Sequence, residues 1–320
     1  MKTEKGLEKQ ATRDAYGQAL ADLSSEFDFV VLDADLSKST KTATFQKVCP
    51  ARFVNCGIAE TNMMGIAAGI ASTGRPVFAS TFAMFAAGRA YDAVRNGIAY
   101  PHLNVKIAAT HAGLSVGEDG ATHQCIEDIA LMRVIPGMVV CCPADGPSTT
   151  AAVRAALQYD GPVYLRLGRL AVPTLYEPDQ LADFTFGKGY VLREGADVCI
   201  VATGLMTARA LDAAQSLWAG GVSAAVLDMP SIKPLDEKLL LSFAQKTGAV
   251  VTVEEHSVLG GLGGAVAEFL GEHCPVPMRR VGVRDVFGSS GKAADVLSTY
   301  HLTAQDIERT VLELLEQKKK

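Results

Sequence analysis

Short apolar runs rich in β-branched residues alternate along this chain with longer segments of helical pattern. The runs at 29–32, 53–56, 76–80, 105–109, 138–142 and 163–167 are predicted strands. Helical patterns fall between them, near 13–24, 60–72, 82–99, 125–133 and 147–158. Because continuously apolar strands that alternate with helices are typical of a parallel sheet covered on both faces, we expect an α/β fold.

The alternation stops at an irregular, Pro-containing stretch and then resumes. Residues 171–188 are interpreted as a linker between domains 1–170 and 189–320. Strands are expected after it at 197–202, 222–227, 249–253 and 278–281, and helices at 205–218, 236–246, 261–271 and 303–315. Thr303, with Asp306 three positions later, is the predicted cap of the last helix. The chain is therefore predicted to form two α/β domains, each a mostly parallel sheet flanked by helices.

Composition excludes several functional classes. The 320 residues carry a net charge of −5, which argues against a nucleic-acid partner. No apolar run is long enough to span a bilayer, and the first residues lack an apolar signal region, so we expect a cytoplasmic protein without a membrane partner. The seven Cys show no zinc-type spacing, and we expect reduced thiols and no metal site on this chain.

The loop 110–124 comes directly after a predicted strand and concentrates polar chemistry. It contains His111, Glu118, Asp119, His123 and three glycines. A loop in this position lies at the carboxyl edge of a parallel sheet, where open α/β folds bind ligands. A solvated, glycine-rich surface loop is the alternative. Two histidines that bracket an aspartate favour a functional site.

Glu60 and a pair of phenylalanines mark two neighbouring strand ends. Glu60 opens a predicted helix just after a strand, where it either favours the helix dipole or exchanges a proton with a heterocycle. Phe82 and Phe85 are three residues apart, which would place both rings on one face of a helix. Such a pair either packs in the core or forms an aromatic wall for a flat ring.

Several motifs together resemble the C-terminal half of transketolases, meaning the pyrimidine-binding domain followed by the C-terminal domain. They are Gly57-Ile58-Ala59-Glu60, Ser80-Thr81-Phe82 with Phe85, Gly117-Glu118-Asp119-Gly120-Ala121-Thr122-His123-Gln124, Pro143-Ala144-Asp145-Gly146, Glu254-Glu255-His256 and Phe287-Gly288-Ser289-Ser290-Gly291. The resemblance covers nearly the whole chain. Where the family often has a third aromatic residue near the pyrimidine, this chain reads Ala86-Ala87-Gly88-Arg89.

The resemblance implies a role for each candidate residue. It makes Glu60, His111 and His123 catalytic, with Glu60 at the aminopyrimidine of thiamine diphosphate. The remaining cofactor contacts would be Phe82, Phe85 and Asp35. The substrate-binding residues would be Arg13, Ser39, Asp119 and Arg169: both arginines and Ser39 would join His111 around a phosphate, and Asp119 would join His123 near sugar hydroxyls and the donor carbonyl. A guanidinium fork suits a phosphate.

One module of the family is not found in this sequence. Thiamine-diphosphate enzymes hold the diphosphate through Mg²⁺ with a Gly-Asp-Gly motif and a later Asn; the sequence has no Gly-Asp-Gly, and its four Asn all precede residue 105. The resemblance therefore implies a split transketolase, in which a separate N-terminal subunit holds diphosphate and Mg²⁺. Two copies of each chain would form a heterotetramer, with homodimerisation inside it.

The implied reaction is transfer of a two-carbon ketol unit from a ketose phosphate to an aldose phosphate. A 1-deoxyxylulose-5-phosphate synthase-like activity is one alternative, although the synthase loop usually lacks a histidine at the position of His111. A transketolase for an unusual sugar is another. A 2-oxoacid dehydrogenase β subunit shares the layout but has a different loop. A non-catalytic partner subunit is disfavoured by the intact Glu60, Asp119 and His123.

Overall fold

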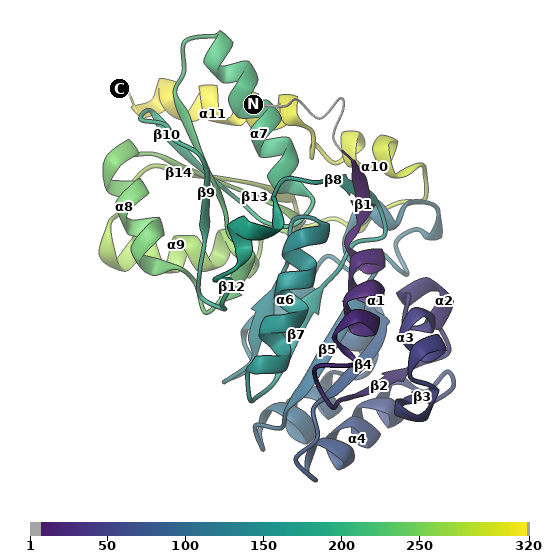
Figure 1. Cartoon of the computed structure of the whole chain (residues 1–320). Coiled ribbons are helices and arrows are strands. Elements are labelled where there is room, and N and C mark those ends of the chain that lie inside the picture. Colours follow the sequence, from purple (N-terminus) through teal and green to yellow (C-terminus); the bar gives the residue numbers. More distant parts are fainter. Residues whose placement is uncertain (1–7, 319–320) are drawn as a thin grey trace.

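The computed structural model describes residues 8–318 and confirms the predicted fold class. Figure 1 shows two α/β domains, each built on its own sheet. The sheet of the first domain has seven strands in the order β12-β6-β7-β5-β4-β2-β3. They are β2 (Val30–Asp33), β3 (Phe53–Asn55), β4 (Val77–Phe82), β5 (Val105–Thr110), β6 (Val139–Cys141), β7 (Val163–Arg166) and β12 (Ser231–Lys233). All of these pair in parallel except β12 with β6.

Helices cover both faces of the first sheet. They are α1 (Thr12–Leu23), α2 (Ser37–Thr40), α3 (Ala43–Val48), α4 (Glu60–Ala71), α5 (Asp128–Arg133) and α6 (Gly146–Gln158). Tyr16 of α1 and Val153 of α6 belong to one buried apolar cluster, whereas Met63 of α4 and Ile129 of α5 belong to another. The strands contribute to both clusters, which explains why their sequences are apolar without alternation.

The second domain has a five-stranded sheet in the order β14-β13-β10-β11-β9. The strands are β9 (Tyr190–Arg193), β10 (Val198–Ala202), β11 (Ala224–Asp228), β13 (Val250–Ser257) and β14 (Met278–Val283), and only β9 pairs antiparallel. The helices are α7 (Met206–Ala219), α8 (Glu237–Thr247), α9 (Leu262–His273), α10 (Ala293–Thr299) and α11 (Ala304–Lys318). Thr303 caps α11 as predicted: its Oγ1 accepts from Asp306 N at 3.2 Å.

Two predicted helices differ from the structure. The predicted helix 82–99 is wrong at its start, because Phe82 is the last residue of β4 and is succeeded by two π-helical segments, Phe85–Arg89 and Ala93–Ala99. Gly88 and Gly97 lie inside these segments, and glycine weakens a regular helix. The predicted helix 125–133 begins only at Asp128, because Cys125 pairs as an isolated parallel bridge with Ala112.

The expected linker contains regular structure. It includes β8 (Ala171–Pro173), which pairs antiparallel with β1 (Lys9–Ala11), and a 3-10 turn, Pro178–Leu181. The strand β12 comes later in the sequence, among the elements of the second domain, but it pairs with β6 of the first sheet. No single point of the sequence therefore separates the two sheets. The predicted domain limits stay a prediction, and their ends at 1–7 and 319–320 lie outside the described residues.

Two further observations concern classes of site. Within residues 8–318, no helix is long and apolar enough to cross a membrane. All seven cysteines are free thiols in the structure, and Cys125, Cys141, Cys142 and Cys199 are buried. The cytoplasmic location stays a prediction.

Candidate active site

Glu60 is buried at the start of α4 and is paired with Arg89. The Glu60 residue is 2% exposed, and Arg89 Nη1 lies 3.1 Å from each carboxylate oxygen. The Arg89 guanidinium also lies over the Phe85 ring, 4.7 Å from its centroid. Sequence analysis did not assign Arg89, which ends the stretch Ala86-Ala87-Gly88-Arg89 where the family often has a third aromatic residue. The one feature of the sequence that could have indicated Arg89 is its position shortly after β4, the strand that ends at Phe82.

The two phenylalanines meet the two histidines of the loop. Phe82 and Phe85 are stacked with centroids 5.8 Å apart, although one is on a strand and the other begins a π-helical turn, so the expected shared helical face is wrong. The His111 ring stacks on Phe82 at 3.8 Å. His123 presents its ring edge-on to Phe85 at 5.5 Å. The structure therefore joins residues from the ends of β4 and β5 and from the loop in one aromatic cluster.

His111 comes directly after β5 and is neutral over the physiological pH range. Its backbone has φ +58°, and its Nε2 lies 3.0 Å from Arg13 Nη1. Because a guanidinium only donates, Nε2 accepts, and the ring proton sits on Nδ1, which donates to Thr110 Oγ1 at 2.9 Å. Burial, reinforced by the positive charges of Arg13 and Arg169, lowers the His111 pKa to about 3.

Arg13 links three distant parts of the sequence. Besides His111, its Nη1 reaches the backbone carbonyl of Ser39 at 3.1 Å. Its Nε is buried and has no hydrogen-bond partner among the described residues. Burial is the largest cause that lowers the Arg13 pKa, and Arg169 adds to it. Arg13 thus contacts two of the residues predicted to lie with it around a phosphate, Ser39 through its backbone carbonyl and His111 through its ring.

The turn that carries Ser39 is held by a carboxylate that sequence analysis did not single out. Asp33, the last residue of β2, accepts from Leu36 N and Thr40 Oγ1, each at 2.6 Å, and from Thr42 Oγ1 at 2.8 Å. Burial raises the pKa of Asp33. Asp35, the predicted cofactor contact, lies in the same turn with φ +64°, is exposed, and accepts from Asn55 Nδ2 at 2.9 Å.

The remaining predicted residues lie on or beside the loop. Arg169 donates to the carbonyl of Val116 and to Glu118 Oε2, the latter at 3.1 Å. Asp119 ends a 3-10 turn, is exposed, and its carboxylate has no hydrogen bond or ion pair in the described part of the chain. His123 is half-buried and its Nδ1 lies 2.9 Å from Thr122 Oγ1.

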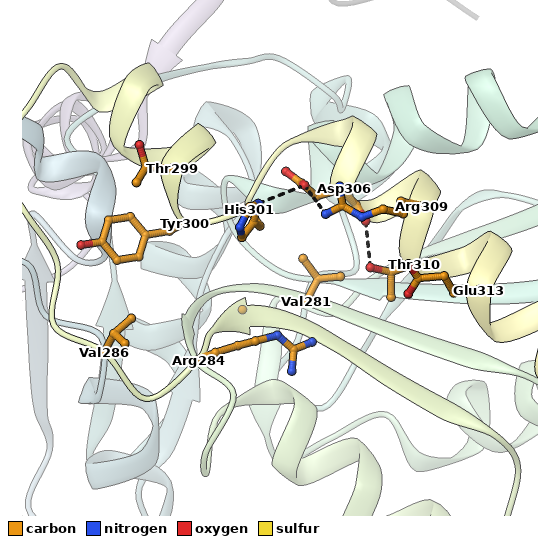
Figure 2. Close-up of a pocket in the computed structure, with 11 residues that line it drawn as sticks. Val281, Arg284, Val286, Thr299, Tyr300, His301, Asp306, Arg309, Thr310 and Glu313 are labelled. Atoms are coloured by element: carbon orange, nitrogen blue, oxygen red, sulfur yellow. Dashed lines mark hydrogen bonds and ion pairs between the residues drawn. The ribbon is translucent and has the colours of Figure 1, made fainter.

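The described chain offers no metal centre beside this cluster. Among residues 8–318, no group of three or more His, Cys, Asp or Glu side chains is placed to hold a metal ion. A separate hollow of about 400 Å³ lies in the second domain between β14, α10 and α11, with Asp306 between His301 and Arg309 (Figure 2). It shares no residue with the cluster around Glu60 and His111.

Comparison with known proteins gives the family. Residues 8–174 match the model of the transketolase pyrimidine-binding domain, and residues 187–307 match that of the transketolase C-terminal domain. This chain belongs to the transketolase family. It is 49% identical over 303 residues to a putative transketolase C-terminal section of Methanocaldococcus jannaschii, covering 94% of this chain and 95% of that protein.

Two further relatives have the same extent. One is a 6-deoxy-6-sulfo-D-fructose transketolase subunit from Clostridium sp. (strain MSTE9), 45% identical over 98% of this chain and 97% of that protein. The other is a solved structure described as a split gene transketolase, an inactive β4 tetramer. It is 57% identical, with a TM-score of 0.89 over 96% of this chain and 98% of that chain. The predicted resemblance to a split transketolase is confirmed.

Proposed function

We propose that this chain is the C-terminal subunit of a thiamine-diphosphate-dependent transketolase and acts with a separate N-terminal subunit. The observation that carries the proposal is the cluster at the carboxyl edge of the first sheet. There the buried Glu60 pairs with Arg89, whose guanidinium lies over Phe85, while Arg13, His111 and Arg169 lie around the loop. The two-chain arrangement is supported by the match, over nearly their whole length, to a transketolase C-terminal section and to a split gene transketolase.

The residues present fit the aminopyrimidine half of the cofactor. That ring needs a carboxylate at a ring nitrogen and an aromatic surface, and Glu60 and Phe85 lie together, bridged by Arg89. Thiamine diphosphate, when bound, supplies the electron sink for ketol transfer. We assign the diphosphate and Mg²⁺ to the N-terminal subunit, because the described residues of this chain offer no metal cluster.

The remaining residues divide between the two ends of the sugar. Arg13 and Arg169 supply positive charge for a phosphate, beside Ser39. Since His111 is neutral and accepts from Arg13, we propose that it contributes mainly by orienting that guanidinium. The carboxylate of Asp119, unpaired within the described chain, and the ring of His123 are placed to contact hydroxyls and the donor carbonyl near the reacting carbons.

The surface near Glu60 supports a subunit contact. Ile58, two positions before Glu60, is 80% exposed. At Gly65 and Gly69 on α4, a side chain would meet nothing within 4 Å in the described chain. Such apolar surface is typical of an interface. Together with the tetramer described for a split-gene relative, it supports homodimerisation within a heterotetramer.

The physiological sugar is left open by the relatives. One of them is named for a sulfosugar, so the relatives do not identify the anionic group of the substrate. We propose sugar phosphates of the pentose phosphate type as substrates, with an unusual sugar as the alternative. We take His111 as an argument against a deoxyxylulose-phosphate synthase, whose loop usually lacks a histidine at this position.

A reconstitution experiment tests the proposal. The chain is co-purified with its native partner, and ketol transfer is measured with a panel of sugar phosphates. We expect activity only with both subunits, thiamine diphosphate and Mg²⁺; transfer by the pure chain would contradict the split arrangement. Glu60→Gln should greatly slow exchange of the thiazolium proton, because an amide cannot exchange a proton with the aminopyrimidine ring nitrogen and so cannot activate the cofactor.

A further inference from the structure

The second domain holds the loop 113–124 through its core. The Leu114 side chain is fully buried and belongs to the apolar cluster of the second domain, together with Ile200 of β10 and Val296 of α10. A loop that extends from the first sheet is therefore anchored in the other domain. The first anchor is apolar and lies next to the glycine at which the loop turns.

Glu255 of β13 provides a second, polar anchor. Its carboxylate accepts the backbone N–H of Ser115, and Ser115 Oγ donates to its other oxygen at 3.2 Å. Gly113 precedes this contact with φ +82°, and a side chain there would overlap the Glu255 carboxylate. The absence of a side chain at 113 therefore permits the close approach of Glu255 to the loop.

The far end of the loop is tied to the same domain. Gln124 Nε2 donates to the carbonyl of Ser289 at 2.9 Å and to that of Gly117 at 3.2 Å. Gly120 lies so close to Ser290 that a side chain at 120 would overlap its hydroxyl. Asp119 and His123 thus lie between two attachment points, both of which depend on the second domain.

Glu255 is itself fixed from the first domain. Arg166 at the end of β7 donates through Nη2 to the backbone carbonyl of Glu255 at 2.9 Å. The same guanidinium forms a buried ion pair with Asp128 at 2.9 Å. Arg166 thus binds the backbone of Glu255 while the carboxylate of Glu255 binds Ser115.

We propose that Glu255 is a positioning residue for the sugar site: through Ser115 it sets where Asp119 and His123 stand. This inference rests on the proposed function, in which the loop contacts the sugar. Glu255 does not touch substrate or cofactor in this scheme. Its loss should raise KM for the sugar and leave cofactor activation by Glu60 unchanged, because the loop moves and the pyrimidine-facing residues do not.

The neighbouring Glu254 offers a matched control. It is also a fully buried carboxylate of β13, but it accepts from Leu262 N at 2.7 Å and Gly263 N at 2.8 Å, at the start of α9. It makes no hydrogen bond with the loop, all of which is described. Glu254→Ala therefore removes a buried acceptor of the same kind from the same strand without releasing Ser115.

The experiment combines hydrogen exchange on the full chain with kinetics on the reconstituted complex. In Glu255→Ala, amides of 113–124 should exchange about tenfold faster, and KM for the acceptor sugar phosphate should rise about tenfold, as expected for losing a charged hydrogen bond. Exchange of the thiazolium proton should stay at the wild-type rate.

Glu254→Ala, the control, should instead speed exchange of the backbone amide hydrogens at 261–266 and leave KM unchanged. If Glu255→Ala does not fold, Glu255→Gln keeps one acceptor and should show the same pattern at smaller size.

Each outcome decides a different claim. Unchanged exchange at 113–124 in the Glu255 variant overturns the anchoring, whatever the kinetics show. Faster exchange with unchanged KM overturns the role in the sugar site, as does an equal rise of KM in Glu254→Ala. A wild-type complex without ketol transfer refutes the proposed function, while the exchange measurement still tests the anchor.

Discussion

The Glu60–Arg89 pair should be energetically coupled in the free chain. Replacing Arg89 with Met keeps most of the side-chain volume and removes the guanidinium that contacts both carboxylate oxygens at 3.1 Å. The Glu60 side chain is 3% exposed and that of Arg89 is 55% exposed. The substitution therefore leaves a buried carboxylate without its cation, and the free energy of unfolding should fall.

The magnitude depends on this unequal exposure. Removing one member of a fully buried ion pair costs about 3–5 kcal/mol, whereas an exposed pair contributes about 0–1 kcal/mol. Because roughly half of the guanidinium stays hydrated, we expect a coupling of about 1–2 kcal/mol, weaker at high salt. The cation–π contact with Phe85 is lost as well, but it is lost with or without the carboxylate and cancels in a cycle.

A double-mutant cycle measures this coupling. Urea unfolding is monitored by circular dichroism for wild type, Arg89→Met, Glu60→Gln and the double variant. Arg89→Met should cost about 1–2 kcal/mol more with Glu60 present than with Gln at 60. A coupling below about 0.5 kcal/mol would refute the view that Arg89 compensates the buried charge. The same cycle on the cofactor-loaded complex should give a smaller coupling energy if the Glu60 carboxylate binds the aminopyrimidine in place of Arg89.

Three further predictions concern the sugar end of the site. Arg13→Ala and Arg169→Ala should raise KM for phosphorylated sugars roughly ten- to hundredfold and spare unphosphorylated acceptors; equal losses in paired steady-state assays would make both arginines structural. Asp119→Ala should leave the melting temperature unchanged, since its carboxylate has no bond in the described chain, while changing the kcat/KM ratio between 2-epimeric aldose phosphates. The His111 pKa is lowered from 6.5 to about 3. As pH falls below 6.5, the imidazole therefore binds a proton in the unfolded chain and stays neutral in the folded chain, which favours unfolding. Stability from this group is complete above pH 6.5 and declines toward pH 3, and His111→Asn should flatten that decline in urea titrations at each pH.

The positions of the site residues could be predicted because they depend on strand ends. Glu60, Phe82 and His111 each stand at or just after the carboxyl end of a strand, and parallel pairing of β2, β3, β4 and β5 brings these ends to one edge. Such placement requires only that the apolar run and the polar residues just after it be recognised. The hydrophobic pattern supplies both, since the strands are buried on two faces.

Elements defined by tertiary pairing could not be predicted in the same way. The strand β12 is three residues long and includes Lys233, whose Nζ donates to the carbonyl of Ile135 at 2.6 Å. No periodicity appears in so short a run, and its register comes from β6 in the other half of the chain. The π-helical turn Phe85–Arg89 is similar, because helical sequence patterns do not distinguish it from an α-helix.

Electrostatics of the site depend on partners that lie far apart in the sequence. Arg13 and His111 are 98 positions apart, and Ser115 and Glu255 are 140 apart. The sequence shows a glycine at 113, but it does not show that the Glu255 carboxylate lies where a side chain at 113 would be. A histidine in a glycine-rich loop suggests a group that titrates near neutral pH, whereas burial beside two arginines keeps His111 neutral. Its chemistry as an acceptor is therefore a property of the assembled fold, and the tautomer at Nδ1 is set by the guanidinium that can only donate.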